Sequence, residues 1–311
     1  MKSAQMKNYG SSEVIEINQD DSVPDPSAGK VLVKVKAAGV NPIDWKIREG
    51  YMKQMIQLHF PSTLGMDFSG IMEEIGSGVT GFSQGDEVYG QASVVSGGSG
   101  AFAEMALANA DSIAHKPKTL SHQEAAGLPL VGVSAWQALV ETIQLKSGQK
   151  ILNHGGAGGI GSIAIQLARH LGAYVATTVS ADDKQFAKEL GADEIIDYKT
   201  QAFDEIIHDY DAVFDTVGRD TYRKSFKVLK KGGIIVSMLE QPDQGLMDRL
   251  GVKAVYQFTQ VNKGRLAKLA EWVDKDNIRV NVDRTFPLDE AAKALDYQKD
   301  QHPRGKIVLA P

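Results

Sequence analysis

Apolar and polar positions alternate along the first third of the chain with the two-residue period of half-buried strands. The runs are KVLVKVKAAGV (30–40), GIMEEIGSG (70–78) and DEVYG (86–90), separated by glycine turns. Between the first two, NPIDWKIREGYM (41–52) predicts a loop that leads into a short helix. QASVVSGGSG (91–100) predicts a surface loop. We therefore expect this third to be β-rich.

The period changes near Ser121, where SHQEAA (121–126) has the spacing of a capping box, with Ser121 as N-cap and Glu124 three residues later. A helical pattern follows over 134–143. From there strands and helices alternate, which predicts βαβ units and a parallel sheet. The predicted strands are 150–155, 173–179, 193–198, 211–218 and 234–238, and the predicted helices are 160–172, 182–191 and 221–233.

Three glycine motifs are predicted to end helices: LGA (171–173), LGAD (190–193) and KKGG (230–233). Two amphipathic helices, 263–276 and 287–300, come next in the pattern, and KIVLA (306–310) is expected to form a terminal strand.

Composition places the chain among globular proteins and removes several functions. Its 311 residues suffice for two domains, with 42% hydrophobic and 23% charged residues. The net charge of -5 argues against a general nucleic-acid surface. The absence of cysteine excludes disulfides, thiol nucleophiles and cysteine zinc sites. No apolar run has the length of a signal peptide or membrane span, so we expect a cytoplasmic protein without membrane or nucleic-acid partners.

The stretch GAGGIG (156–161) fits the dinucleotide fingerprint G-x-G-x-x-G. The match is weak alone, because the chain has 31 glycines. It is strengthened by a strand before it, a helix with an apolar face opening on it, and a second strand afterwards. Gly156 is expected to permit the tight turn, Gly158 the approach of a pyrophosphate, and Gly161 close helix packing. Gly159 and Ile160 complete the predicted cofactor-binding stretch.

The end of the second predicted strand bears on the choice of cofactor. An NAD site usually has an acidic residue there, for the ribose 2′-hydroxyl, but this strand ends in TTVS (177–180). Asp182 and Asp183 come later and fit the first turn of a helix. The residues that could instead receive a 2′-phosphate are Ser180 and Lys184, with Tyr198 and Lys199 closing over it. We therefore expect NADPH rather than NADH.

Several stretches, in this order, resemble the zinc-free quinone oxidoreductase (zeta-crystallin-like) branch of the medium-chain dehydrogenase/reductase superfamily. They are AAGVNPIDWKIREG (37–50), LGMDFSGIMEEIGSGVTGFSQGDEVYG (64–90), GAFAEMA (100–106), GGAGGIGSIAIQLAR (155–169), VFDTVG (213–218) and RGKIVL (304–309). The resemblance implies a GroES-like catalytic domain over 1–122 and 262–311 and a doubly wound Rossmann domain over 123–261. It also implies NAD(P)H binding and a homodimer through the Rossmann sheet edge.

The resemblance also indicates which chemistry is missing. Zinc-dependent relatives carry a cysteine near the position of Asn41, and a Gly-His-Glu motif where this chain has Gly65, Met66 and Asp67. No metal ligand set is therefore expected, and a Lewis acid is not available to polarise a carbonyl. Quinones and α,β-unsaturated carbonyls need less polarisation, because conjugation spreads the developing charge. The expected reaction is hydride transfer from NADPH to a quinone, enone or enal.

Candidate catalytic residues lie in the loop that relatives place beneath the nicotinamide. Asn41 offers an amide donor or begins a turn, and Asp44 is expected to orient a neighbour, to relay a proton or to cap the helix. Tyr51 offers a hydroxyl donor to a substrate oxygen or is a surface aromatic. Asp67 is expected to hydrogen-bond the backbone rather than act in the reaction.

Further cofactor contacts are implied by position. Ser134 matches a hydroxyl that relatives place near the nicotinamide ribose, with a helix-face residue as the alternative. Val217 and Gly218 follow a strand, where open α/β sheets bind ligands. Lys306 could approach the cofactor from the terminal strand, and Asp215 is expected to be structural.

Two other functions stay open: a non-catalytic NADPH-binding structural or regulatory protein, and a zinc alcohol dehydrogenase, which the ligand positions disfavour. The shape of the substrate pocket is expected to depend on the loops 51–61, 91–100 and 240–262. Because the sequence does not predict the conformations of these loops, it does not decide whether quinones or enones are the preferred substrates.

Overall fold

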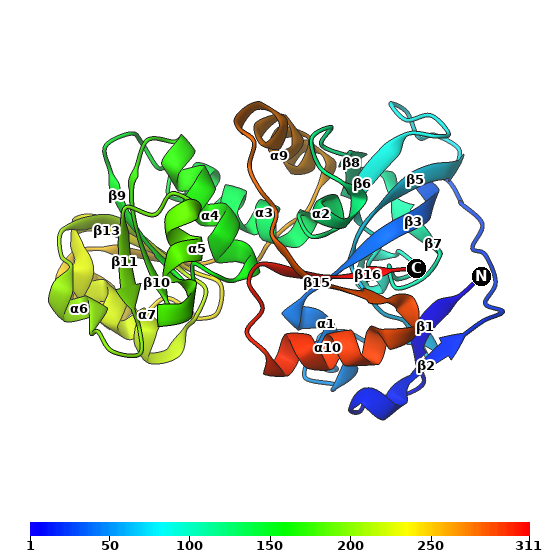
Figure 1. Cartoon of the computed structure of the whole chain (residues 1–311), viewed down its shortest axis with the longest axis horizontal. Helices are drawn as coiled ribbons and strands as arrows, with labels where there is room; N and C mark the ends of the chain where they lie inside the picture. The colour runs from blue at the N-terminus through cyan, green and yellow to red at the C-terminus, as the bar shows by residue number, and fades with distance from the viewer. The chain divides into compact units, whose positions relative to one another are not determined.

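The computed structural model describes all 311 residues. The chain forms two compact units (Figure 1). The first unit combines Met1–Leu130 with Val261–Pro311, and the second is Val131–Gln260. The domain limits expected from the sequence, 1–122 with 262–311 and 123–261, stay a prediction.

The first unit is built on mainly antiparallel strands from both ends of the chain, with one parallel pair, β15 and β16. A seven-stranded sheet has the order β15-β16-β3-β5-β6-β8, with β7 paired to β3, and a smaller sheet has the order β2-β1-β4. The strands are β1 (Ser3–Met6), β2 (Ile15–Asn18), β3 (Lys30–Val40), β4 (Ser62–Thr63), β5 (Asp67–Ile75), β6 (Glu87–Gln91), β7 (Met105–Asn109), β8 (Ile113–His115), β15 (Val282–Pro287) and β16 (Lys306–Ala310).

The alternation that predicts a strand over 30–40 is confirmed by β3. Val33 and Val35 are buried there, while Lys34 and Lys36 between and beyond them are exposed. β16 pairs antiparallel with the end of β3, which ties the last residues of the chain to the first unit. This pairing places residue 306 close to residue 41.

Four helices belong to the first unit, and a fifth, α3, begins at its boundary. They are α1 (Pro42–Arg48), α2 (His122–Ala126), α9 (Lys263–Asp276), α10 (Ala291–Asp300) and α3 (Pro129–Trp136). The predicted capping box of α2 is confirmed, since the Ser121 hydroxyl accepts from the Glu124 N–H and the Glu124 carboxylate accepts from the Ser121 N–H. The helix predicted over 263–276 coincides with α9.

The second unit holds a six-stranded parallel sheet in the order β11-β10-β9-β12-β13-β14. The order reverses between β9 and β12, which defines the switch point of a doubly wound sheet. The elements are β9 (Lys150–His154), α4 (Gly159–His170), β10 (Tyr174–Val179), α5 (Lys184–Glu189), β11 (Glu194–Asp197), α6 (Phe203–Ile206), β12 (Tyr210–Asp215), α7 (Arg219–Ser225), β13 (Leu229–Ser237), α8 (Gln244–Leu250) and β14 (Lys253–Tyr256).

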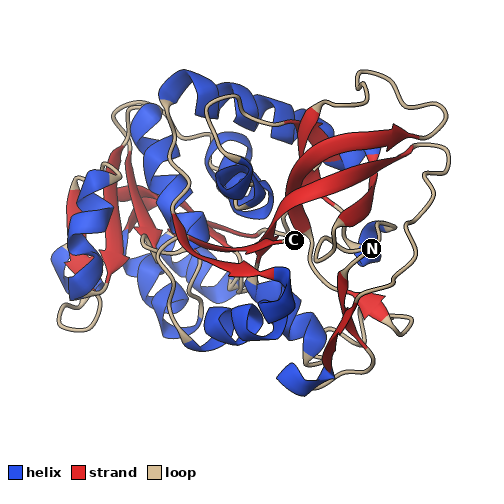
Figure 2. Cartoon of the chain, turned by 45° about the vertical axis from the view of Figure 1, so that its right-hand side comes forward, coloured by secondary structure: helices blue, strands red, loops and turns tan.

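Helices lie on either side of these strands (Figure 2). Tyr222 and Phe226 share one apolar core with Leu152 and Ala176 of the sheet, while α4 packs on β9 and β10. None of the chain's helices is long and apolar enough to cross a membrane.

One predicted helix is wrong over half its length. The helix expected over 221–233 ends at Ser225, and residues 229–233 begin β13. KKGG therefore lies in a strand and does not end a helix. The other two glycine predictions are confirmed, because Gly172 and Gly191 follow α4 and α5 with φ of 78° and 99°. Residues 137–142, inside the helical pattern predicted for 134–143, form a π-helical segment after α3.

Candidate active site

The glycine stretch lies at the carboxyl end of the central strand of the parallel sheet. β9 ends at His154, and α4 begins at Gly159 with Gly158 as its N-cap. The turn is closed by the Gly158 N–H, which donates to the Gly155 carbonyl at 3.0 Å. The first N–H groups of α4 have no partner within the helix, and its dipole favours an anion there. The turn therefore has the position and polarity of a phosphate site.

Three positions near the turn require glycine, each for a different steric reason. Gly155, not Gly156, takes the left-handed conformation, with φ of 72°. A Cβ at Gly156 would instead strike the Thr177 hydroxyl and lie 3.0 Å from Ile165 Cδ1. A Cβ at Gly161 would overlap the Gly155 carbonyl, consistent with the close packing expected there. These contacts fix the shape of the turn from within the chain.

Gly158 differs from its neighbours in the turn. A Cβ there would meet nothing nearer than the Gly155 oxygen, at 3.4 Å. The side of Gly158 that lacks a side chain is thus open, and a pyrophosphate would meet bare backbone N–H groups there. The turn fits the dinucleotide that the fingerprint predicts.

The residues predicted to receive a 2′-phosphate gather at one corner of the sheet. Val179 and Asp197, at the ends of β10 and β11, are paired in register, which brings Ser180 and Tyr198 to the same edge. Ser180 donates to the Asp183 carboxylate at 2.6 Å. Lys184 opens α5, and its Nζ lies 3.8 Å from the Asp197 carboxylate.

This corner is accessible. The Lys184 side chain is 46% exposed and Tyr198 is 56% exposed, whereas the Asp197 side chain is only 5% exposed. Lys199 follows, with its ammonium 6.0 Å from the Tyr198 ring centroid. Asp182 and Asp183 lie in a first helical turn, as expected. The corner thus presents the ammonium groups of Lys184 and Lys199 and the hydroxyl groups of Ser180 and Tyr198 at the carboxyl edge.

Asp215 organises the loops that follow β12 and β13. One carboxylate oxygen accepts from the N–H groups of Val217 and Gly218 at 3.0 and 2.9 Å. The other accepts from the Ser237 hydroxyl at 2.7 Å, which in turn accepts from the N–H groups of residues 239 and 240. The expected structural role of Asp215 agrees with these contacts. Val217 is half exposed at this edge.

Ser134 on α3 is buried, and its hydroxyl lies 2.7 Å from the Thr259 hydroxyl. Its carbonyl accepts from the Gln257 amide at 2.9 Å. These contacts tie α3 to the segment that leaves the second unit. The proposed ribose contact of Ser134 would have to form alongside them.

In the first unit, Asn41, Asp44, Asp67 and Lys306 form a buried polar cluster. Asn41 is the N-cap of α1, and its N–H donates to Asp44 Oδ2 at 2.7 Å, closing a capping box. Its side-chain amide donates to Asp67 Oδ2 at 3.0 Å. The Lys306 ammonium donates to the Asn41 side-chain oxygen and, at 2.7 Å, to the Val40 carbonyl. Both polar ends of Asn41 are therefore engaged within the chain.

Asp67 accepts more hydrogen bonds than Asp44, the other carboxylate of the buried cluster. Gln91 donates to Oδ1 at 2.7 Å, and the Leu130 N–H joins Asn41 on Oδ2 at 3.1 Å. In contrast, Asp44 Oδ1 is buried without a hydrogen-bond partner. The expectation that Asp67 hydrogen-bonds the backbone fits its contact with Leu130.

Burial governs the protonation of this cluster. Desolvation raises the pKa of Asp44 to about 7, and the hydrogen bond from the Asn41 backbone opposes this only in part. Desolvation likewise raises the pKa of Asp67, against the opposing effect of Lys306. The pKa of Lys306 is lowered by burial, and the two carboxylates partly restore it. The cluster thus combines two carboxylates and one ammonium in a site that disfavours net charge.

Tyr51 contrasts with the other two catalytic candidates. Asn41 and Asp44 are buried, whereas Tyr51 follows α1 and is 71% exposed. Its ring makes an edge-to-face contact with Trp45 at 5.9 Å. Of the three candidates, Tyr51 alone is exposed, and it takes no part in the hydrogen bonds of the buried cluster.

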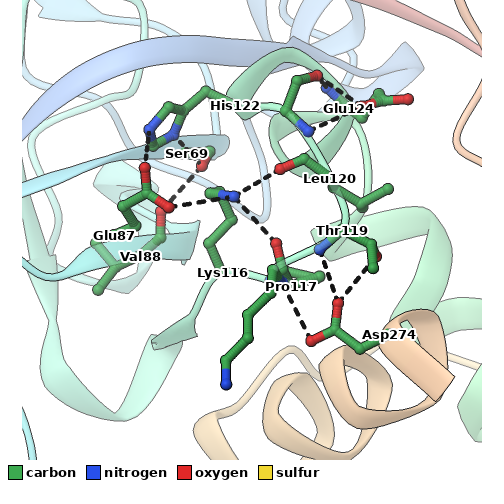
Figure 3. A network of polar contacts seen from close by, with 12 residues as sticks. Ser69, Glu87, Val88, Lys116, Pro117, Thr119, Leu120, His122, Glu124 and Asp274 are labelled. Carbon is green, nitrogen blue, oxygen red and sulfur yellow. Dashed lines mark hydrogen bonds and ion pairs between the residues drawn. The ribbon is translucent and has the colours of Figure 1, made fainter.

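A second polar network in the first unit was not found from the sequence (Figure 3). The Ser69 hydroxyl lies 2.8 Å from His122 Nδ1, and His122 Nε2 lies 3.3 Å from Glu87. This order resembles a nucleophile, base and acid. However, Ser69 is fully buried and donates to the Val88 carbonyl at 3.0 Å, so its oxygen is unavailable to a substrate. We interpret the network as structural.

The same view shows how the segment before α2 is fixed. Lys116 donates to the carbonyls of Pro117 and Leu120 at 3.0 and 2.6 Å, and Asp274 on α9 accepts from the N–H groups of residues 118 and 119. No group of three or more histidine, aspartate or glutamate side chains is arranged to hold a metal ion.

Comparison with known proteins bears on this arrangement. Residues 27–118 match the alcohol dehydrogenase GroES-like domain family, and residues 190–309 match a family described as zinc-binding dehydrogenase. A 2-methylene-furan-3-one reductase from Solanum lycopersicum is 35% identical over 320 residues, covering 100% of this chain and 79% of the relative. An NADPH-dependent alkenal/one oxidoreductase from Arabidopsis thaliana is 34% identical, covering 100% of this chain and 80% of the relative.

Solved structures agree over the full length. The quinone oxidoreductase of Coxiella burnetii superposes with a TM-score of 0.91 at 35% identity, covering 100% of this chain and 99% of that one. The Escherichia coli quinone oxidoreductase complexed with NADPH superposes with a TM-score of 0.89 at 27% identity, covering 100% of both chains. The chain belongs to the medium-chain dehydrogenase/reductase superfamily, in its quinone oxidoreductase branch.

Proposed function

We propose that the chain is an NADPH-dependent reductase of quinones or α,β-unsaturated carbonyls. The observation that carries this proposal is the open glycine turn at the N-terminus of α4, beside a corner that presents Lys184, Ser180 and Tyr198. The names of the relatives support it, since they include an NADPH-dependent alkenal/one oxidoreductase and quinone oxidoreductases.

Different residues of the chain bind different parts of NADPH. The first-turn N–H groups of α4 bind the pyrophosphate, and Lys184, Ser180 and Tyr198 bind the 2′-phosphate. Val217 and Gly218, held by Asp215, border the cofactor at the carboxyl edge. When bound, NADPH supplies a hydride to a conjugated acceptor. Tyr51 donates a hydrogen bond to the substrate oxygen, where negative charge develops.

We propose further that the reaction uses no zinc. The chain has no cysteine, and methionine stands in the position of the ligating histidine. The oxygen atoms of Asn41 and Asp67 are already paired with the Lys306 ammonium and with amide donors. The Asn41 oxygen is therefore occupied by the Lys306 ammonium, and the Asp67 oxygens are occupied by amide and backbone N–H donors, so these oxygens already have partners within the chain. A cytoplasmic location and a homodimer formed through an edge of the β11–β14 sheet also stay proposals.

The test of function is a substrate panel. Purified protein is mixed with NADPH and a set of quinones, enones and enals, and absorbance of the reduced nicotinamide is followed. Oxidation with at least one class is expected, and the ratio of rates settles the preference. Tight NADPH binding without turnover on any acceptor would favour the non-catalytic alternative. Turnover that depends on stoichiometric bound zinc would favour an alcohol dehydrogenase.

Lys184→Ala should weaken NADPH much more than NADH. A charge-assisted hydrogen bond to the 2′-phosphate is worth about 1.5–3 kcal/mol, or roughly 10- to 150-fold in Kd. Fluorescence titration of both nucleotides measures the ratio. Lys188→Ala, on the same helix in its last turn, is the matched control and should change neither affinity. Equal losses for NADPH and NADH in Lys184→Ala would reject the 2′-phosphate role.

A further inference from the structure

His154 is the last residue of β9 and directly precedes the glycine turn, yet it is fully buried. Its Nδ1 lies 3.0 Å from the Thr178 hydroxyl, and its Nε2 lies 2.9 Å from the Ser225 hydroxyl. The ring packs edge-on against Phe203, with centroids 4.7 Å apart. One imidazole therefore links the central strand to β10 on one side and to α7 on the other.

The hydrogen atoms of this network can be assigned from its ends. Ser225 has one hydroxyl hydrogen, which it donates to the Thr221 carbonyl at 2.6 Å. Its oxygen must then accept from His154, so Nε2 carries the hydrogen. Nδ1 is consequently an acceptor and receives the Thr178 hydroxyl hydrogen. The reverse tautomer would leave the Ser225 and Thr221 oxygens facing each other without a hydrogen.

Thr178 connects the oriented His154 side chain to the glycine turn. Its hydroxyl oxygen accepts from the Gly155 N–H at 3.3 Å, and its carbonyl accepts from the Gly156 N–H at 3.1 Å. Thr216 directly follows β12, the neighbour of β9 on the side away from β10, and its hydroxyl donates to the His154 carbonyl at 2.8 Å. The hydrogen bonds thus run without interruption from Gly155 through Thr178 and His154 to α7.

The imidazole is neutral near neutral pH. Burial lowers the pKa of His154 to about 4, and the charge of Asp215 opposes this only in part. A proton on Nδ1 would face the Thr178 hydroxyl, whose own hydrogen would then lose its acceptor. The network therefore requires the neutral form that burial favours.

We propose that His154 is a positioning residue for the dinucleotide turn. As the neutral Nε2–H tautomer it orients the Thr178 hydroxyl, which fixes the Gly155 N–H and the left-handed turn that presents the N-terminus of α4. Gly155 has no side chain that could fix its backbone, and glycine adopts many backbone conformations in a free chain. The inference rests on the proposed function, because the ligand of the turn is taken to be the cofactor pyrophosphate.

The tautomer can be observed without cofactor. Long-range ¹H–¹⁵N NMR correlation of the imidazole distinguishes Nε2–H from Nδ1–H, and His154→Gln assigns the signal by its disappearance. We expect a single Nε2–H tautomer that stays neutral when the pH is lowered to about 5.5. An Nδ1–H tautomer, or an imidazole that titrates near the ordinary value of histidine, would overturn the proposal.

Binding is tested with Thr178→Val, which keeps the shape but removes the hydroxyl, and with Thr178→Ser, which keeps the hydroxyl. Thr178→Val should weaken NADPH and NADH by the same factor, on the order of tenfold, because the pyrophosphate is common to both. Thr178→Ser should stay within about twofold of the unaltered protein. A lowered melting temperature of Thr178→Val with unchanged affinity for both nucleotides would indicate a merely structural role and contradict the proposal.

The experiments distinguish failure of the proposed function from failure of the positioning role. If the unaltered protein binds neither nucleotide, the proposed function is wrong and the positioning role falls with it. If it binds NADPH and Thr178→Val binds equally tightly, the proposed function stands and the role of His154 is rejected.

Discussion

Gly161→Ala should destabilise the second unit by about 2–3 kcal/mol and abolish measurable NADPH binding. The added Cβ would lie 2.8 Å from the Gly155 carbonyl carbon and 2.9 Å from Gly156 Cα, and closer still to the Gly155 oxygen. These are backbone atoms, which cannot rotate away as a flexible side chain can. The overlap is relieved only if α4 moves away from the turn, and this movement would remove its N–H groups from the phosphate. Urea unfolding and nucleotide titration measure the two effects.

Gly158→Ala is the matched control within the same turn. Gly158 has φ of -76°, and a Cβ there would be 3.4 Å from its nearest neighbour. Stability should fall by no more than about 1 kcal/mol, the cost of alanine at an N-cap. NADPH should still weaken by on the order of tenfold or more, because the methyl group occupies the open side of the turn. Unaltered NADPH affinity in Gly158→Ala would show that the phosphate approaches elsewhere.

The strands and the main helices could be predicted because their signals are local. The alternation of Val33, Lys34, Val35 and Lys36 is enough to define β3, since one face of that strand is buried. The helix predicted over 221–233 failed because Val228 and Leu229 continue an apolar pattern that suits either element. The decision between them comes from pairing of β13 with β12, a tertiary contact that the local pattern does not contain.

The same distinction separates the parts of the candidate site. Ser180 and Tyr198 could be placed together because adjoining parallel strands end at the same edge. The pairing of Lys306 with Asn41 joins positions 265 residues apart and depends on the register of β16 against β3. One signal was available: Lys306 opens KIVLA, an otherwise apolar strand, and a cation there needs a buried partner. His154, in the strand ILNH, carried a similar signal.

Lys306→Met should destabilise the protein by about 3–5 kcal/mol at about pH 8, because it leaves two buried carboxylates without their cation. Asp44 has a folded-state pKa of about 7 against 3.8 for the ordinary group. A carboxyl group with a raised pKa binds its proton more tightly in the folded state, so acidification between these values stabilises the fold. Without the ammonium this window extends to higher pH. The deficit of Lys306→Met should therefore shrink as the pH is lowered from about 8 to about 5, as urea unfolding at each pH would show.

The double variant Lys306→Met/Asp44→Asn separates charge from packing. Removal of the Asp44 charge should recover at least about half of the lost stability at about pH 8, since Asp67 keeps its three donors from Gln91, Asn41 and the Leu130 backbone. The pH dependence of the deficit should weaken at the same time. The cofactor contact expected for Lys306 from the sequence makes the opposite prediction: Lys306→Met would unfold like the unaltered protein at every pH and bind NADPH more weakly. If Lys306→Met is as stable as the unaltered protein at every pH and binds NADPH more weakly, Lys306 is assigned to cofactor binding. If Lys306→Met is destabilised and Asp44→Asn restores its stability, Lys306 is assigned to the buried cluster.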